Sequence, residues 1–476
     1  MATLDFTKYS LYRWRYIIGY TLVGLLLAAV LLFAGTFLPG ALSAPEMSSV
    51  VVSESLRLND PSTLAVANLP YHLLQAGFFQ LFGISVFTIK LPSLIFALLS
   101  ALGLIVLLRR WFKPNIAVMA SLIAISTSQF LYIAQLGAPN ILNIFWPIAL
   151  LLLGTQITRV KKLRFLWKAL FATTAALSLY TPFSIYALLA IGLSIALHPH
   201  LRSIVRRLSK VRLAIISALL LVLVAPLIFF IFKDPSLSLT LIGAPASWPP
   251  SLLENIITLG RQYLLFWEPN NGTSMTPVYG LGSALLIIIG LYRLIRTRET
   301  TRSYLIIIWL LCLTPVLILN PGISSVTFVP SVLLLAAGLT SLIGYWYRLF
   351  PRNPYARIAG LVPIIILVSA LIISGLARYA YGYSYNPAAV ARFSSDLSLL
   401  PADTKQLVVA EDEKAFWSAV ARYKEGIEVV TEPTAPRFVL TRAALRDDFA
   451  GYTIVRIITN PMSEASNRLY IYQKAN

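Results

Sequence analysis

The chain has 476 residues, of which 58% are hydrophobic and only 12% are charged. A soluble globular domain carries about a quarter charged residues, so most of this chain is expected to lie in lipid. The net charge of +20 does not indicate a nucleic-acid partner, because the basic residues fall in short clusters between apolar runs. The single cysteine, Cys312, excludes an intrachain disulfide and a cysteine metal cluster.

Apolar runs long enough to cross a bilayer recur along the chain. They predict about eleven transmembrane helices, at residues 16–38, 91–108, 115–136, 140–158, 165–181, 183–198, 213–232, 278–292, 304–320, 324–346 and 358–377. No small-residue cleavage site ends the first run, so we interpret it as an anchored helix and not a cleaved signal peptide.

The basic residues predict the orientation of these helices. With a cytoplasmic N-terminus and alternating spans, the inner segments hold 23 basic residues, and 12 more follow residue 377. The outer loops hold the other four, which are Arg57, Lys90, Lys233 and Arg261. Cytoplasmic loops carry the excess of Lys and Arg. We therefore expect a multi-pass cell-membrane protein with its N-terminus in the cytoplasm.

Residues 70–89 are apolar enough to be mistaken for another span. Counting them as one would place Arg109 and Arg110 outside and would invert every later loop. They are therefore predicted to form a helix that lies at the outer membrane interface or dips partly into it. The transmembrane part then covers residues 1–377, with two long outer loops at 39–90 and 233–277.

The composition changes after residue 377. Residues 382–476 mix acidic and basic side chains with short β-like runs and with a helical stretch at 412–423. Placed after an odd number of spans, this segment predicts a small extracytoplasmic α/β domain. The expected fold class is an all-α polytopic membrane protein that carries this domain at its C-terminus.

Ionisable side chains are almost absent from the predicted spans. Ion-coupled transporters and pumps usually carry such residues within the membrane, so a transporter is disfavoured. The two outer loops are therefore the regions in which function is expected.

Four short segments near the first outer loop form an ordered set. They are Glu46 after the first span, Asn68-Leu69-Pro70-Tyr71, Leu81-Phe82-Gly83 and Lys90-Leu91-Pro92-Ser93. In this order they resemble the GT-C glycosyltransferases that use polyprenyl-phosphate-linked sugars, in particular the protein mannosyltransferase and aminoarabinose transferase-like group. The resemblance continues through residues 115–158 and 256–292.

The resemblance implies a GT-C-like enzyme that moves a sugar from a polyprenyl-phosphate donor to an acceptor hydroxyl outside the cytoplasm. Glu46 is expected to be the general base, and Lys90 and Arg261 are expected to stabilise the departing phosphate. One displacement would invert the anomeric centre. The expected partners are a polyprenyl-phosphate-linked sugar, a glycan, lipid or protein acceptor, and membrane lipids, with no nucleic acid.

Three further positions depart from the family pattern or stand beside it. Asn140 occupies the place of a second acidic residue, and Asn68 stands where a Lys or His is usual. Both, with His72, are candidate acceptor or second-motif positions, although His72 is expected chiefly as an interfacial aromatic. The sequence predicts no cofactor with certainty, and it leaves open whether a divalent metal binds. The missing second acid favours the alternative of a non-catalytic GT-C-like lipid-binding or envelope-assembly scaffold.

Overall fold

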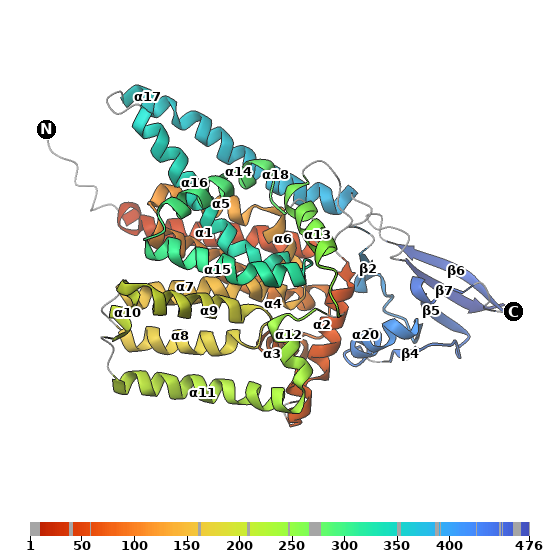
Figure 1. The fold of residues 1–476 in the computed structure, drawn as a ribbon. Coiled ribbons are helices and arrows are strands. Elements are labelled where there is room, and N and C mark those ends of the chain that lie inside the picture. The colour runs from red at the N-terminus through yellow and green to blue at the C-terminus, as the bar shows by residue number, and fades with distance from the viewer. Residues whose placement is uncertain are drawn as a thin grey trace.

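A bundle of long helices with a small β-sheet unit at one end makes up the molecule (Figure 1). The structure is a computed structural model. It describes residues 10–37, 41–57, 59–159, 163–206, 210–245, 248–265, 278–349, 354–385, 390, 392–424, 426–446, 449, 451–459 and 468–475.

The helices of the bundle follow the predicted spans in order. They are α1 (Ser10–Phe37), α4 (Val86–Trp111), α5 (Pro114–Ile125), α6 (Ser128–Gln135), α7 (Leu142–Arg159), α8 (Arg164–Ser178), α9 (Ser184–Leu197), α10 (Pro199–Arg206), α11 (Lys210–Lys233), α14 (Leu281–Arg296), α15 (Thr301–Leu319), α16 (Phe328–Leu349) and α18 (Leu361–Tyr385). Within the described residues, six helices are long and apolar enough to cross a membrane, or up to eight if each bent pair is one span. The predicted polytopic helical fold class is confirmed, although several helices are shorter than a full span.

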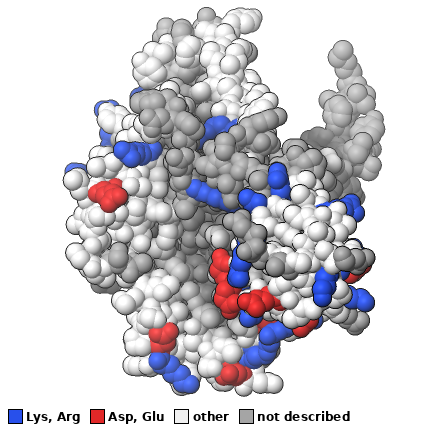
Figure 2. All heavy atoms as spheres, turned by 90° about the vertical axis from the view of Figure 1, so that its right-hand side faces the viewer, with Lys and Arg blue, Asp and Glu red and all other residues white. Residues whose placement is uncertain are grey.

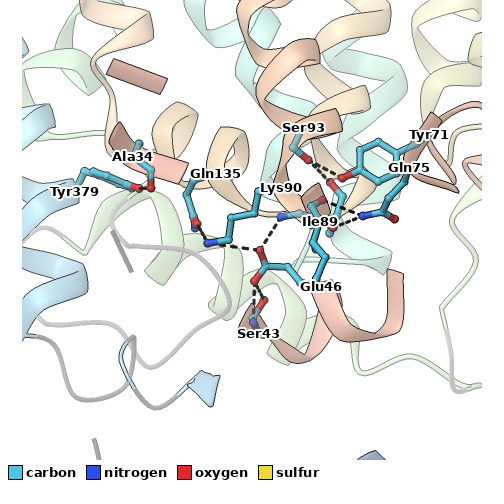
Figure 3. Close-up of polar contacts among 12 residues, drawn as sticks. Ala34, Ser43, Glu46, Tyr71, Gln75, Ile89, Lys90, Ser93, Gln135 and Tyr379 are labelled. Atoms are coloured by element: carbon cyan, nitrogen blue, oxygen red, sulfur yellow. Dashed lines mark hydrogen bonds and ion pairs between the residues drawn. The ribbon is translucent and has the colours of Figure 1, made fainter. Parts of the chain in front are cut away.

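One of the predicted spans, at residues 115–136, is broken into α5 and α6, which meet at an angle of 59°. Helix α10 follows the predicted span at 183–198 and meets α9 at 95°, in a segment that was expected to be a loop. At the break between α5 and α6, Thr127 accepts a hydrogen bond from the backbone N–H of Phe130 and so caps α6. The new direction of α6 places Gln135, at its end, beside Lys90 of α4 (Figure 3).

Close approach of backbones holds part of the bundle together. A Cβ atom at Gly290 on α14 would lie 1.9 Å from the carbonyl oxygen of Leu334 on α16. One at Gly338 on α16 would lie 2.0 Å from the carbonyl oxygen of Leu286. Small residues allow membrane helices to pack in this way without a hydrophobic driving force.

The first of the two long loops, predicted to lie outside, folds into short helices. Strand β1 (Leu42–Ser43) leads into α2 (Ala44–Ser55), and η2 (Pro61–Leu64) precedes α3 (Leu69–Phe82). The predicted interfacial helix at 70–89 is thus shorter than expected. The chain turns at Gly83, whose φ of 72° favours glycine, and α4 begins at Val86. Lys90 consequently lies in the first turns of a long helix and not in a loop.

The remaining short elements lie between and after these helices. They are η3 (Pro139–Ile141), α12 (Pro235–Ile242), α13 (Leu252–Leu264), η4 (Ser324–Thr327), α17 (Pro354–Ala359), η5 (Leu397–Leu399) and η6 (Arg442–Ala444). Helices α12 and α13 belong to the second outer loop, of which residues 266–277 lie outside the described residues.

The C-terminal residues form a five-stranded sheet with one helix, which we call the C-terminal unit. Its elements are β3 (Gln406–Val408), α20 (Glu411–Ala421), β4 (Glu428–Val430), β5 (Arg437–Thr441), β6 (Tyr452–Thr459) and β7 (Arg468–Lys474). The strand order is β4-β3-β5-β7-β6, with β3 parallel to β4 and β5, and β7 antiparallel to β5 and β6. Strand β2 (Phe393–Ser395) stands apart and pairs antiparallel with β1.

The C-terminal unit shares its core with the first outer loop (Figure 1). Phe416 and Trp417 of α20 belong to one buried cluster with Val50 of α2, Phe79 of α3 and Ile89 of α4. Glu54 of α2 also forms an ion pair with Arg422. The unit is therefore packed against α2 and against the N-terminal end of α4.

Candidate active site

Glu46, the predicted base, is held by hydrogen bonds at the start of α2. Its side chain is fully buried. The backbone N–H and the hydroxyl of Ser43 each donate to Oε2 at 2.7 Å. The backbone N–H of Gly137 donates to Oε1 at 2.7 Å. A carboxylate at the third position of a helix commonly bonds back to the capping residue, which explains the contact with Ser43.

Lys90, the predicted phosphate ligand, faces the same carboxylate (Figure 3). Its Nζ lies 3.8 Å from Glu46 Oε1 and 3.0 Å from Gln135 Oε1, and its side chain is fully buried. The ring centroid of Phe393 lies 5.9 Å from Nζ. The two predicted residues are thus brought together from α2 and α4. Burial of such a pair is tolerated because the charges face each other and each has further hydrogen bonds.

A glycine makes the contact between the α6–η3 loop and this pair possible. A Cβ atom at Gly137 would lie 2.8 Å from Ile89 Cγ2 and 2.9 Å from the Ile89 carbonyl oxygen. Any side chain would therefore push the loop away from α4. With glycine, the backbone N–H reaches Glu46, and a fixed dipole is aimed at the carboxylate.

A second polar network supports the pair from the side of α3 (Figure 3). The buried Gln75 side chain accepts hydrogen bonds from Ser49 at 2.9 Å and from Ser53 at 2.6 Å. Its amide donates to the Ile89 carbonyl at 2.9 Å. The Tyr71 hydroxyl lies 2.8 Å from that of Ser93. These bonds fix α2 and α3 against the first turns of α4 and so hold Lys90 in place.

His72 belongs to this supporting network. Its Nδ1 lies 2.8 Å from the Ser53 hydroxyl. Burial lowers the pKa of His72 to about 4, so the imidazole is neutral at physiological pH. No contact within the described residues joins it to Glu46 or Lys90.

The segment after α18 closes the site. The sequence did not predict this contribution from the C-terminal part of the chain. Arg392 donates a hydrogen bond to Tyr132 of α6, and Tyr132 in turn interacts electrostatically with Glu46. Asp396 interacts electrostatically with Lys90. The only local signal was a basic-aromatic step soon after the last span. The pairing of β2 with β1 that brings it here joins residues far apart in the chain.

The other predicted site residues lie apart from the pair. Arg261 is exposed on α13, and no contact among the described residues joins it to Glu46 or Lys90. Asn140 is exposed in η3. Asn68 precedes α3 in a left-handed conformation with φ 58°, and its backbone N–H donates to the Tyr180 carbonyl at 2.6 Å. Among the described residues, no three His, Cys, Asp or Glu side chains cluster as metal ligands would.

Comparison with known proteins identifies the fold. Residues 69–230 match the family model described as dolichyl-phosphate-mannose-protein mannosyltransferase. The structure of ArnT from Cupriavidus metallidurans bound to undecaprenyl phosphate superposes with a TM-score of 0.55 at 13% identity, covering 95% of this chain and 98% of that chain. The chain has the GT-C fold of membrane glycosyltransferases.

A second GT-C structure is similar over a large part of the chain. The Archaeoglobus fulgidus oligosaccharyltransferase tethered with an acceptor peptide matches with a TM-score of 0.50 at 14% identity, covering 88% of this chain and 65% of that chain. A search of curated protein sequences found no significant match. Lys90 and Gln135 fall within the residues matched by the family model, whereas Glu46 precedes them. The structure thus brings a buried carboxylate and a buried amine together in a chain with the GT-C fold.

Proposed function

We propose that the chain transfers a sugar from a polyprenyl-phosphate donor to an acceptor hydroxyl on the extracytoplasmic side of the membrane. The observation that carries this proposal is the fully buried Glu46–Lys90 pair, 3.8 Å apart at the outer end of α4, in a chain with the GT-C fold. The similar ArnT structure is described as bound to undecaprenyl phosphate, which supports a donor of this class. The acceptor is a glycan, lipid or protein hydroxyl.

The proposed reaction is one displacement. The acceptor oxygen bonds to the anomeric carbon while the bond from that carbon to the phosphate oxygen breaks. The electron pair leaves with the polyprenyl phosphate, and Glu46 takes the hydroxyl proton. Lys90 balances the charge of the departing phosphate. Attack opposite the leaving group inverts the anomeric configuration.

Donor binding would also change the contacts of Glu46. In the structure, Lys90 Nζ lies 3.8 Å from Glu46 Oε1. A donor phosphate would compete with Glu46 for Lys90, and Glu46 would then keep the hydrogen-bond donors of Ser43 and Gly137.

Arg261 is proposed as a second cation for the donor phosphate. It lies on α13 in the second outer loop, and residues 266–277 that follow lie outside the described residues. Replacing Arg261 by Ala should weaken polyprenyl-phosphate binding without changing the melting temperature, because its side chain is exposed. Unchanged binding in this variant would remove Arg261 from the site.

A Glu46→Gln variant tests the mechanism. With donor lipids extracted from the host and the protein in nanodiscs, sugar transfer should fall about 10²–10⁴-fold, the usual contribution of a general base. Polyprenyl phosphate should still bind, because Lys90 is intact. The matched control is Glu299→Gln, an exposed glutamate between α14 and α15. Transfer at the wild-type rate in the Glu46 variant would end the proposed role.

The second candidate function is a non-catalytic scaffold that binds the polyprenyl lipid. It is favoured by the exposed Asn140 in place of a second acid. It is also favoured by the hydrogen bonds that both carboxylate oxygens of Glu46 already accept within the protein. It predicts polyprenyl-phosphate binding by the wild type with no sugar transfer to any acceptor fraction of the host envelope.

A further inference from the structure

Three arginines gather at the end of the bundle away from the C-terminal unit. Arg293 is in the last turn of α14, Arg302 in the first turn of α15 and Arg348 in the last turn of α16. Arg302 Nη1 donates a hydrogen bond of 2.6 Å to the carbonyl oxygen of Trp111, where α4 ends. Lys90 lies roughly 30 Å back along α4, at a rise of 1.5 Å per residue. The arginine cluster and the Glu46–Lys90 pair are therefore separated by about the thickness of a bilayer's hydrocarbon core.

The charges of these three arginines oppose one another. Arg293 is repelled by Arg348, and Arg302 is repelled by Arg293. Cations are favoured in the last turn of a helix, so the helix dipole accounts for Arg293 and Arg348 taken singly. Arg302 is in the first turn of α15, where the dipole disfavours a cation and no acidic residue offsets it. A bound anion would relieve both the repulsion and the unfavourable dipole.

No acidic side chain neutralises the cluster within the described part of the chain. Glu299, in the turn between α14 and α15, is the only Asp or Glu from Leu281 to Leu349. No ion pair between described residues includes Glu299 or any of the three arginines. The end of the molecule that carries the C-terminal unit differs, because acidic and basic side chains lie side by side there (Figure 2).

Arg302 is fixed in position before any ligand binds. Its guanidinium carbon lies 4.5 Å from the ring centroid of Phe112, a cation–π contact, and the Trp111 carbonyl holds Nη1. A guanidinium that is already ordered loses less entropy for each hydrogen bond that it forms with an anion. The planar group also matches the oxygens of a phosphate, to which it can donate two parallel hydrogen bonds.

The surroundings of the cluster favour a lipid over a soluble anion. The arginines lie at the ends of three apolar helices, and large side chains exposed beside them are Tyr292 and Ile295 on α14 and Tyr345 and Leu349 on α16. Tyrosine is enriched where membrane helices meet the headgroup region. Basic pockets between membrane helices bind the headgroups of anionic lipids. Such a lipid would place its phosphate among the arginines and its acyl chains along the exposed apolar side chains.

We propose that Arg293, Arg302 and Arg348 bind the phosphate of an anionic phospholipid. The lipid stabilises the packing of α14, α15 and α16 at this end by neutralising their repulsion. In the proposed orientation it belongs to the cytoplasmic leaflet. The inference does not depend on the proposed function, because the cluster and the Glu46–Lys90 pair lie at opposite ends of α4.

Competition between two lipids with the same acyl chains tests the proposal. The full chain is reconstituted in nanodiscs with equal amounts of dioleoylphosphatidylglycerol and dioleoylphosphatidylcholine, and native mass spectrometry of the released protein counts the lipids that it retains. Wild type should retain phosphatidylglycerol in preference. Arg302→Gln and Arg348→Gln should each lower this preference about tenfold, the effect of losing one hydrogen bond to a charged group. Equal retention of the two lipids by wild type would overturn the inference.

Arg159→Gln is the matched control. Arg159 is exposed in the last turn of α7. A hydrogen bond of 2.9 Å from Trp111 Nε1 to the Thr155 hydroxyl places that turn at the same end of the bundle. The variant removes one positive charge from this end but none from the cluster, so it should keep the wild-type preference. An equal loss of preference in this variant would assign the effect to net charge and would remove the site.

The melting temperature separates a binding site from a structural role. Arg348 is exposed, so Arg348→Gln should melt as wild type does in nanodiscs of phosphatidylcholine alone. Adding phosphatidylglycerol should raise the melting temperature of wild type more than that of the variant. Equal rises in the two proteins would contradict the proposal. Inorganic phosphate added in place of phosphatidylglycerol should raise neither, and a rise as large as that with the lipid would show that the site takes a soluble anion instead.

Discussion

At the scale of single residues, Glu46 and Lys90 depend on each other. Both are fully buried, and each has hydrogen bonds in addition to the ion pair. Removing one partner of a buried pair leaves an uncompensated charge, which typically costs about 3–5 kcal/mol. Removing both leaves no such charge.

Variants of the pair should therefore be strongly non-additive. Lys90→Met is expected to lower the free energy of unfolding by about 3–5 kcal/mol. The double variant Glu46→Gln with Lys90→Met should recover most of that loss but should still not bind polyprenyl phosphate. Chemical unfolding in detergent measures the first effect and native mass spectrometry the second. If the double variant loses as much unfolding free energy as the two single variants together, the two residues are not coupled.

His72 makes stability depend on pH. Its folded pKa of about 4 lies below the ordinary value of 6.5, so the unfolded chain binds more protons between these limits. Stability should therefore be complete above pH 6.5 and should fall as the pH drops towards 4, by up to about 3 kcal/mol. A His72→Gln variant should show a flatter profile of melting temperature against pH. Identical slopes in the two proteins would contradict the assignment.

At the scale of elements, apolar runs were enough to predict the long helices of the bundle, but not α10, which lies in a basic segment. They could not predict the break between α5 and α6, because Ser126 and Thr127 are ordinary residues within an apolar run. The end of the interfacial helix was missed for a related reason. Gly83 ends α3 through its positive φ, but a single glycine is equally acceptable inside a membrane helix.

The contact between α14 and α16 gives a test at this scale. Gly290→Ala would place a methyl group 1.9 Å from the Leu334 carbonyl oxygen, so the two helices must separate. We expect a loss of about 1–3 kcal/mol in unfolding free energy, as for other overpacked sites. Gly344→Ala, with no heavy atom within 4 Å on α16, is the matched control and should be neutral or slightly stabilising. Equal effects would rule out the close approach.

At the scale of the whole molecule, the sequence predicted the two parts but not how they meet. The strand-like runs and the helix of the C-terminal segment were visible in its composition. Its packing on α2 joins residues such as Val50 and Trp417, which no local pattern relates. The candidate site could be predicted only in part, for the same reason. Glu46 and Lys90 could be named from ordered motifs, whereas Arg392, Asp396 and Gly137 take part only through long-range contacts.

Orientation is a property of the whole chain and can be tested with single cysteines. In a Cys312→Ser background, Lys474→Cys should react with a membrane-impermeant maleimide on intact cells, and Arg298→Cys should react only after permeabilisation. Both positions are exposed, so accessibility depends on the side of the membrane alone. The reverse pattern would invert the proposed topology and would place the Glu46–Lys90 pair on the cytoplasmic side.

The most direct test of the donor site is native mass spectrometry of the protein released gently from the membranes of its own host. Wild type should carry a polyprenyl phosphate or polyprenyl-phosphate sugar, whose mass identifies the sugar. The Lys90→Met variant should lose it and keep ordinary phospholipids. Phospholipids alone on the wild type, or equal polyprenyl-phosphate occupancy in both proteins, would contradict the role assigned to the buried pair.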